Sequence, residues 1–221
     1  MSSTVKSSLR KQVANRLSYL SSNTISTQSI NATNLITKQP FYENANSIAL
    51  YMHLPDIELE TNHLLAHALN SNKKVFLPRI EKLEKFNDYK RFEKQKSCLH
   101  FLSVSSMDQV NNFIPRGKYQ IREPDYEPNM GNDMIHSDTK IDVLFLPAVA
   151  YTKDGRRLGH GGGFYDDFIK RYQTHFNHRP LLVGIGLEEQ LIMNSQDILL
   201  EPHDECLDYV IVGNQFYKCH A

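Results

Sequence analysis

A glycine-rich segment flanked by two arginines and two aspartates, residues 156–167, most constrains how this chain can fold. Four of the chain's 10 glycines fall in it, namely Gly159, Gly161, Gly162 and Gly163. Because glycine loses much conformational freedom on folding, such a cluster indicates backbone with positive φ or backbone that closely approaches a ligand. An apolar run precedes the segment, and aromatic residues recur every four positions after it, at Phe164, Phe168, Tyr172 and Phe176. The pattern predicts a strand, a loop and a helix, in that order.

A glycine-rich loop at the start of a helix is a candidate anion site, because unpaired N–H groups and the helix dipole favour negative charge there. The segment has no Gly-Lys-Ser/Thr and is therefore not a Walker A loop. The long connection from strand to glycines, residues 148–158, argues against a dinucleotide fingerprint. The glycines alone fit a structural turn equally well. The neighbouring arginines and aspartates favour a nucleotide bound together with a metal ion.

Residues 146–150 (Leu-Pro-Ala-Val-Ala) and 154–166 (Asp-Gly-Arg-Arg-Leu-Gly-His-Gly-Gly-Gly-Phe-Tyr-Asp) resemble the signature of the 5-formyltetrahydrofolate cyclo-ligase family, also called methenyltetrahydrofolate synthetases. Shorter matches occur in the family's order at residues 6–10, 58–61, 74–78, 123–124 and 203–208. Phe164 stands where the family usually has tyrosine, and Ala148 replaces a glycine. Residues 120–122 match the family more loosely. The resemblance spans nearly the whole chain.

The resemblance implies particular roles for residues of this chain. Those implied to bind ATP are Lys6, Ser7, Ser8, Leu9, Arg10, Arg157, Leu158, Gly159, His160, Gly161, Gly162, Gly163, Phe164 and Tyr165. Those implied to bind the folate substrate are Arg10, Met52, Glu58, His160, Gly161, Gly162, Gly163 and Phe164. Asp166 and Asp204 match the family's Mg²⁺ aspartates, whereas Asp167 has only the favourable dipole position of the first helical turn. Arg157 is the expected charge-neutralising residue, and Tyr165 the ring that stacks on the substrate and orients it.

The implied reaction is the ATP- and Mg²⁺-dependent conversion of 5-formyltetrahydrofolate to 5,10-methenyltetrahydrofolate, with release of ADP and phosphate. Two alternatives remain open from the residues: a folate- or nucleotide-binding protein without turnover, and a different enzyme on a similar scaffold, such as a sugar-phosphate isomerase or CoA transferase. His63 and His67 lie four apart and could form half of a zinc site, but the residues between them lack the glutamate of zinc proteases. The same interpretation applies to His175 and His178.

Strand-like and helix-like segments alternate along the chain. Helices are expected at residues 7–20, 27–38, 61–70 and 163–175, and strands at 47–52, 74–77, 143–146, 181–187 and 209–212. A charged surface region is expected at 80–100, with an edge hairpin near 89–92, and a polar loop at 122–138. The alternation predicts a single α/β domain, residues 1–221, with a mostly parallel open sheet and helices on both faces. Ligands bind outside the carboxyl ends of such strands, so residues 52–58, 78–79 and 147–163 should meet there.

Composition narrows the partners and the compartment. Lys+Arg and Asp+Glu are equal at 25 each, which gives no field for nucleic acid, and no apolar run reaches the length of a membrane span. The three cysteines are odd in number and scattered, which fits free thiols in a reducing compartment. We also expect a monomer. The first acidic residue is Glu43, and the basic, serine-rich segment before it resembles a mitochondrial transit peptide. Its cleavage would remove Lys6 and Arg10, so we expect a cytoplasmic protein, with the mitochondrion as second choice.

Overall fold

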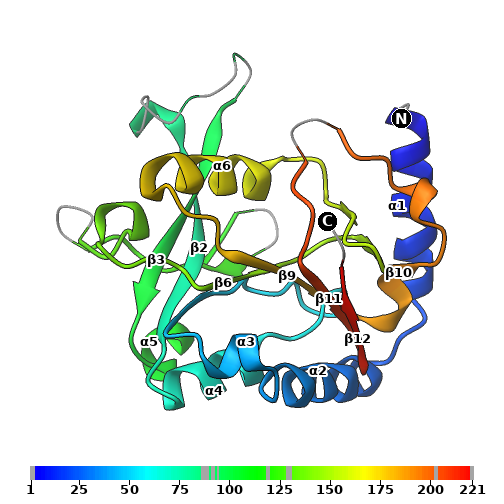
Figure 1. Cartoon of the computed structure of the whole chain (residues 1–221), viewed down its shortest axis with the longest axis horizontal. Helices are drawn as coiled ribbons and strands as arrows, with labels where there is room; N and C mark the ends of the chain where they lie inside the picture. The colour runs from blue at the N-terminus through cyan, green and yellow to red at the C-terminus, as the bar shows by residue number, and fades with distance from the viewer. Residues whose placement is uncertain are drawn as a thin grey trace.

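The computed structural model describes residues 3–85, 90, 93, 95–117, 120–127, 131–201 and 204–219. Its centre is a seven-stranded sheet with the strand order β12-β11-β9-β6-β1-β2-β3 (Figure 1). The strands are β1 (Ser47–Ala49), β2 (Lys74–Lys82), β3 (Ser97–Val104), β6 (Val143–Leu146), β9 (Leu181–Gly186), β11 (Tyr209–Val212) and β12 (Gln215–Lys218). The five inner strands run parallel, and β3 and β12 pair antiparallel at the two edges.

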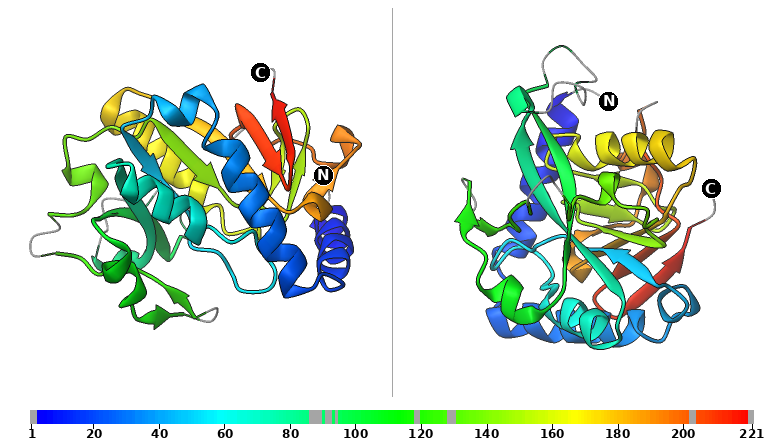
Figure 2. Two further views of the ribbon diagram at one scale, coloured as in Figure 1. Left: turned by 90° about the horizontal axis from the view of Figure 1, so that it is seen from below. Right: turned by 90° about the vertical axis from the view of Figure 1, so that its left-hand side faces the viewer.

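Helices cover both faces of this sheet. They are α1 (Ser3–Leu17), α2 (Ser22–Ile36), α3 (Pro40–Glu43), α4 (Asn62–Asn70), α5 (Met107–Asn111) and α6 (Phe164–Phe176). Figures 1 and 2 show α6 on one face, α2, α3 and α4 on the other, and α1 beyond one side of the sheet. The predicted α/β class, with a mostly parallel sheet and helices on both faces, is confirmed. Within the described ranges, no helix is both long enough and apolar enough to cross a membrane.

The chain reverses its direction of winding between two neighbouring strands. From β1 it crosses through α4 to β2 on one side, whereas from β6 it crosses through α6 to β9 on the other side. β1 and β6 pair directly, with Ile48 opposite Val143 and Ala49 opposite Leu144. Such a switch point opens a crevice at the carboxyl ends of the two strands, which is where ligands bind in open α/β sheets. The segments that follow β1 and β6 are therefore placed to form a site.

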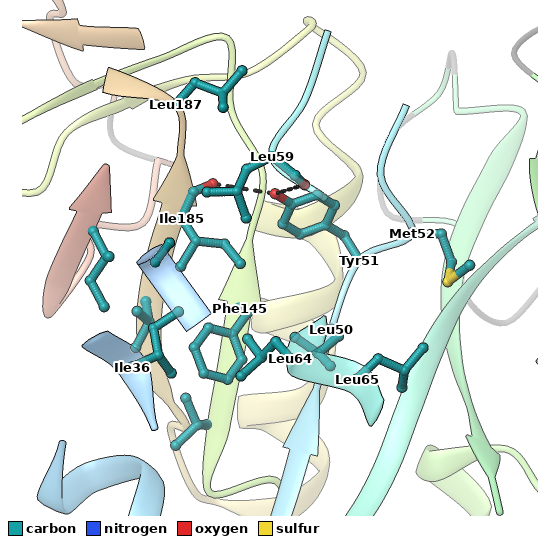
Figure 3. Close-up of a cluster of buried hydrophobic side chains, with 14 of the residues drawn as sticks. Ile36, Leu50, Tyr51, Met52, Leu59, Leu64, Leu65, Phe145, Ile185 and Leu187 are labelled. Carbon is teal, nitrogen blue, oxygen red and sulfur yellow. Dashed lines mark hydrogen bonds between the residues drawn. The ribbon is translucent and has the colours of Figure 1, made fainter. Parts of the chain in front are cut away.

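Strand β6 shows why the sheet is buried on both sides. All four of its residues are buried; Val143 and Phe145 belong to the apolar cluster beneath α2 and α4, and Leu144 and Leu146 to the cluster beneath α6. This alternation follows from the two-residue period of a strand. Burying each of these large side chains stabilises the fold by about 1.5–3 kcal/mol. Figure 3 shows the first cluster, with Phe145 packed among residues that include Ile36, Leu64 and Ile185.

The structure differs from the sequence-based expectations in the middle of the chain. Part of the region expected to be charged surface forms β3, whose residues from Cys98 to Leu102 are buried. β2 continues to Lys82 instead of ending at residue 77, so Arg79 lies inside a strand and pairs with Glu81 and Asp125 rather than entering the site. Of the hairpin expected near residues 89–92, residues 89, 91 and 92 lie outside the described residues.

Several short elements were also not expected. A small sheet has the order β10-β7-β8, with β7 (Ala150–Thr152), β8 (Arg157–Leu158) and β10 (Leu191–Ile192). A two-stranded ribbon joins β4 (Pro115–Arg116) to β5 (Ile121–Arg122). The short 3₁₀ helices are η1 (Leu83–Lys85), η4 (Met134–His136), η5 (Glu188–Gln190) and η6 (Ser195–Asp197). Because β7 and β8 form a hairpin between β6 and α6, the glycine segment starts from a fixed position.

Candidate functional site

A cavity of about 590 Å³ lies beside the glycine segment. Four parts of the chain line it: the first turns of α1, Pro147 directly after β6, residues 157–166, and the segment before β11. The lining residues are Lys6, Ser7, Arg10, Pro147, Arg157, Leu158, Gly159, His160, Gly161, Gly162, Gly163, Phe164, Tyr165, Asp166, Ile198, Leu199, Glu201 and Asp204. The cavity thus brings together residues from both ends of the sequence and from the loop that follows β6.

The helical period decides which residues of α1 reach this cavity. Lys6 and Arg10 lie four apart and share the face toward it. Leu9 is on another face, packed in the core with Val13, and Ser8 is exposed outside the cavity. Of the five α1 residues expected to bind ATP, the structure places Lys6, Ser7 and Arg10 at the cavity.

The α1 helix is tied to the glycine segment by Arg10. Its Nε donates to the carbonyl of Gly159 at 2.9 Å. Gly161 has φ +102°, and a Cβ added there would lie 3.5 Å from an Arg10 guanidinium nitrogen. Gly163, with φ +65°, is the N-cap of α6. Positive φ at Gly161 and Gly163 is strained for other residues, which explains why the segment needs glycine there.

Arg157 and Asp166 form an ion pair beside the cavity. Nη2 of Arg157 lies 2.6 Å from Oδ1 of Asp166, and their side chains are 7 % and 16 % exposed. Nε of Arg157 is buried and has no hydrogen-bond partner within the described part of the chain. A buried guanidinium N–H without a partner is costly, and an anion at this position would satisfy it.

Two aspartates at the cavity could hold a divalent cation. Oδ1 of Asp166 also accepts from the backbone N–H of Glu205 at 3.1 Å, and no hydrogen bond to its Oδ2 is found among the described residues. Oδ2 of Asp204 accepts from the backbone N–H of Glu201 at 2.8 Å. The described residues contain no group of three or more histidine, cysteine or acidic residues suited to a metal. Mg²⁺ bound with a nucleotide needs only one or two carboxylates, so this pair fits such an ion.

Glu58, in the loop after β1, lies next to His160 of the glycine segment. It is 7 % exposed, and its Oε2 accepts from the backbone N–H of Leu54 at 2.8 Å. Its Oε1 is 3.7 Å from Nε2 of His160, which itself lines the cavity. Glu58 therefore meets the cavity through His160. Met52, by contrast, is 9 % exposed and packs in the core, and Figure 3 shows it on the opposite side of its segment from Tyr51.

Three tyrosines lie near Glu58: Tyr51 and Tyr151 are buried, and Tyr165 is partly buried at the cavity. The hydroxyl of Tyr51 donates to the carbonyls of Leu59 at 3.2 Å and Ile185 at 3.4 Å (Figure 3). Burial raises the pKa of Tyr51, Tyr151 and Tyr165 well above the ordinary value, and the nearby charge of Glu58 adds to this. These hydroxyls therefore stay neutral near pH 7 and act as hydrogen-bonding groups.

Comparison with known proteins assigns the chain to a family. A model of the 5-formyltetrahydrofolate cyclo-ligase family matches residues 2–213. The chain belongs to this family. It is similar to the 5-formyltetrahydrofolate cyclo-ligase of Saccharomyces cerevisiae, with 32% identity over 95% of each chain, and to that of Mus musculus, with 26% identity over 93% of this chain and 92% of the relative.

A solved structure shares the fold of this family member. The 5,10-methenyltetrahydrofolate synthetase of Aquifex aeolicus superposes with a TM-score of 0.72 at 22% identity, covering 98% of this chain and 94% of that one. At this level of identity the likeness shows the fold. Membership of the cyclo-ligase family and the fold therefore agree with the resemblance read from the sequence.

Some charged residues near the family's glycine segment hold the fold together instead of facing the cavity. Arg156 pairs with Asp154 at 3.0 Å and donates to the carbonyl of Ile198 at 3.2 Å. Asp167 pairs with Arg171 at 3.0 Å, and both side chains are 8 % exposed. The dipole role expected for Asp167 is thus incomplete, since its carboxylate also holds a buried arginine; the four-residue spacing of the pair was the available signal.

Sequence reasoning did not identify Glu201 as a residue of the site. Glu201 forms an ion pair with Lys6 across the cavity, over 195 positions of sequence. No local pattern around either residue indicates this contact, because it depends on how α1 packs against the segment before β11. His203, in the family match at residues 203–208, lies outside the described residues.

Proposed function

We propose that this protein converts 5-formyltetrahydrofolate to 5,10-methenyltetrahydrofolate, using ATP and releasing ADP and phosphate. The observation that carries the proposal is the cavity beside the glycine segment that follows β6, where Nε of Arg157 is buried and has no hydrogen-bond partner among the described residues. Lys6 and Arg10 add positive charge to the same cavity. The names of the relatives support the folate substrate, and the basic side chains beside the glycine segment support a phosphate-bearing co-substrate.

The formyl oxygen of the substrate is a poor leaving group, and the reaction requires that it be converted into a good one. Transfer of the γ-phosphoryl group of ATP to the formyl oxygen leaves ADP and makes that oxygen part of a phosphate ester. The N10 lone pair then attacks the formyl carbon, N10 loses its proton, and the C–O bond breaks as phosphate departs. Ring closure forms the five-membered ring. The protein contributes positioning and charge neutralisation. Positioning of the reactants can lower the activation barrier by up to about 7–11 kcal/mol.

The residues at the cavity divide into groups suited to these steps. Lys6, Arg10 and Arg157 would neutralise the phosphates. Asp166 and Asp204 would hold Mg²⁺, which supplies further positive charge to the phosphate oxygens when bound. Glu58 would accept N–H groups of the pterin, and Tyr165 would stack on the substrate.

This reaction needs no covalent protein nucleophile. A Cys-His-Asp arrangement does occur in the fold: Nε2 of His100 lies 3.1 Å from Sγ of Cys98, and its Nδ1 lies 2.7 Å from Oδ2 of Asp133. All three side chains are fully buried away from the cavity. Burial raises the pKa of Cys98 to about 11, so the thiol is not a nucleophile near pH 7. We assign this trio to the core.

We further propose that the protein is a cytoplasmic monomer that binds no nucleic acid, with the mitochondrion as second choice. Removal of a transit peptide from the N-terminal segment would take away Lys6 and Arg10, which line the cavity. Tagging the chain at its C-terminus and locating it by microscopy tests the compartment. Sedimentation of the purified protein tests the oligomeric state.

The activity is tested by incubating purified protein with 5-formyltetrahydrofolate, ATP and Mg²⁺. The near-ultraviolet absorbance of the methenyl product and the release of ADP should rise together, and omission of ATP or addition of a chelator should abolish both. Binding of folate without product would favour a binding protein without turnover. Binding of neither substrate would favour a different enzyme on the same scaffold.

A further inference from the structure

His160 stands between the two halves of the proposed site. Its imidazole is 57 % exposed at the cavity, yet Nε2 lies 3.7 Å from Oε1 of Glu58, whose side chain is only 9 % exposed. The other oxygen of Glu58 is held by the backbone N–H of Leu54 at 2.8 Å. Oε1 is therefore the oxygen that Glu58 presents to the glycine segment. A contact at 3.7 Å with a half-exposed imidazole is longer than a hydrogen bond, so a ligand that hydrogen-bonds to Oε1 can displace it.

The residues on either side of His160 lie near the cationic side chain of Arg10. The carbonyl of Gly159 accepts from Arg10 at 2.9 Å, and a Cβ added at Gly161 would lie 3.5 Å from a nitrogen of the same guanidinium. Gly161 also has φ +102°, a conformation available to few other residues. His160 therefore lies directly after a residue that is hydrogen-bonded to Arg10 and directly before one that leaves no free space beside it. A change in the position of His160 is expected to alter how the segment meets Arg10, which lines the cavity.

We propose that His160 couples the two substrates: it occupies Glu58 while folate is absent, and folate releases it toward the nucleotide phosphates. This inference rests on the proposed function, in which pterin N–H groups bind Glu58. With so little of Glu58 exposed, the pterin and the imidazole compete for Oε1. The released imidazole can donate an N–H to a phosphate oxygen, and Gly159 to Gly161 are freed to close on it. His160 is thus a positioning residue whose arrangement differs between the two states.

The coupling has a required direction and a required symmetry. A ligand shifts a conformational equilibrium only as far as it distinguishes the two states, and folate distinguishes them at Glu58. Folate should therefore tighten nucleotide binding. By thermodynamic linkage the nucleotide must tighten folate binding by the same factor, and such couplings are commonly about 5- to 150-fold.

The test is calorimetric titration of a non-hydrolysable ATP analogue with Mg²⁺, with and without saturating 5-formyltetrahydrofolate, and the reverse titration. In the wild type we expect each ligand to tighten the other about fivefold or more. In His160→Ala the factor should fall below about two, while folate alone binds as tightly as before or more tightly. His160→Phe, which also has no N–H donor, should behave like His160→Ala. The matched control is His63→Ala, an exposed histidine on α4, which should keep the wild-type coupling.

Two results would overturn the inference while leaving the proposed function intact. One is coupling of the wild-type size in both His160 variants; the other is wild-type protein that binds both ligands independently. A wild-type protein that binds no folate overturns the proposed function, and the coupling with it. Melting temperatures of the variants within a few degrees of the wild type establish that the titrations compare folded proteins.

Discussion

The guanidinium of Arg157, the first residue of β8, lies 2.6 Å from the carboxylate of Asp166, in the first turn of α6. The pair spans the glycine segment, so each side chain fixes the other's position at the cavity. Arg157 uses Nη2 for this contact and keeps Nε buried without a partner among the described residues. The guanidinium is therefore held in place before any ligand arrives, which is the condition for effective electrostatic stabilisation of a transferring phosphoryl group.

Arg157→Ala should lower turnover about a hundredfold, because loss of one preorganised donor costs about 2.7–4 kcal/mol of transition-state stabilisation. Steady-state rates with saturating substrates measure the effect. The matched control is the neighbouring Arg156→Ala. Arg156 pairs with Asp154 outside the cavity lining, so its loss should change turnover only a few-fold. Near-normal turnover in folded Arg157→Ala would remove this residue from the mechanism.

Asp166→Asn and Asp167→Asn should separate a metal requirement from a structural one. Asp166→Asn should raise the Mg²⁺ concentration for half-maximal activity severalfold, because it replaces a candidate carboxylate ligand with an amide. Asp167→Asn should leave that concentration nearly unchanged. It should instead lower the melting temperature, since it removes the charged partner of buried Arg171, at about 1–3 kcal/mol. Magnesium titrations and thermal melts on both variants decide the matter, and the reverse pattern would shift the metal assignment by one residue.

Local sequence patterns were enough to predict the central strand and helix of the fold and part of the site. Four apolar residues before the glycine segment and a four-residue aromatic repeat after it predicted β6 and α6. The four-residue spacing of Lys6 and Arg10 predicted their shared face. These predictions hold because strand and helix periods are set by backbone geometry and need no knowledge of distant residues.

The sequence was a poorer guide where distant pairing decides the structure. β3 was missed because its five buried residues, from Cys98 to Leu102, follow a strongly charged region, and their burial depends on pairing with β2 and packing beneath α6. Leu9 resembles a site residue by its position in the family motif, but α1 turns it into the core. The Lys6–Glu201 pair follows from tertiary packing alone.

The three cysteines should differ sharply in reactivity. Burial raises the pKa of Cys98 to about 11 and that of Cys219 to about 12; it also raises the pKa of Cys206, but this thiol is only half-buried and a reagent can reach it. Because the thiolate is the reactive form, a thiol reagent at pH 8 should modify native Cys206 alone, and unfolding should expose the other two. Cys206→Ser should abolish native labelling; rapid labelling of Cys98 in the native protein would contradict the placement of β3.

Burial of Cys98 also predicts how stability depends on pH. An unfolded thiol ionises near pH 8.5, about its ordinary value, but the folded one ionises near the raised pKa of about 11. A raised folded-state pKa means that this contribution to stability is complete below about pH 8.5 and is lost as the pH rises through 11. Denaturant melts of wild type and Cys98→Ala between pH 7 and 10.5 should therefore diverge, with the wild type losing more of its unfolding free energy. Parallel curves would contradict the buried neutral thiol.

Glu58→Gln should separate the folate half of the site from the nucleotide half. Glu58 follows β1 and meets the cavity through His160, whereas Arg157 and the glycine segment follow β6. Leaving pterin donors poorly paired costs about 1–3 kcal/mol, so folate affinity should fall about tenfold or more, at 1.4 kcal/mol per decade. Affinity for the ATP analogue without folate should not fall and should rise toward its folate-bound value, because Glu58→Gln also removes the carboxylate that holds His160.

Glu60→Gln, two positions along the same loop and outside the cavity lining, is the control and should alter neither affinity. Calorimetric titration of each ligand separately provides the measurement. If Glu58→Gln weakens the nucleotide and spares folate, then Glu58 belongs to the phosphate side and the pterin must lie elsewhere at the sheet edge.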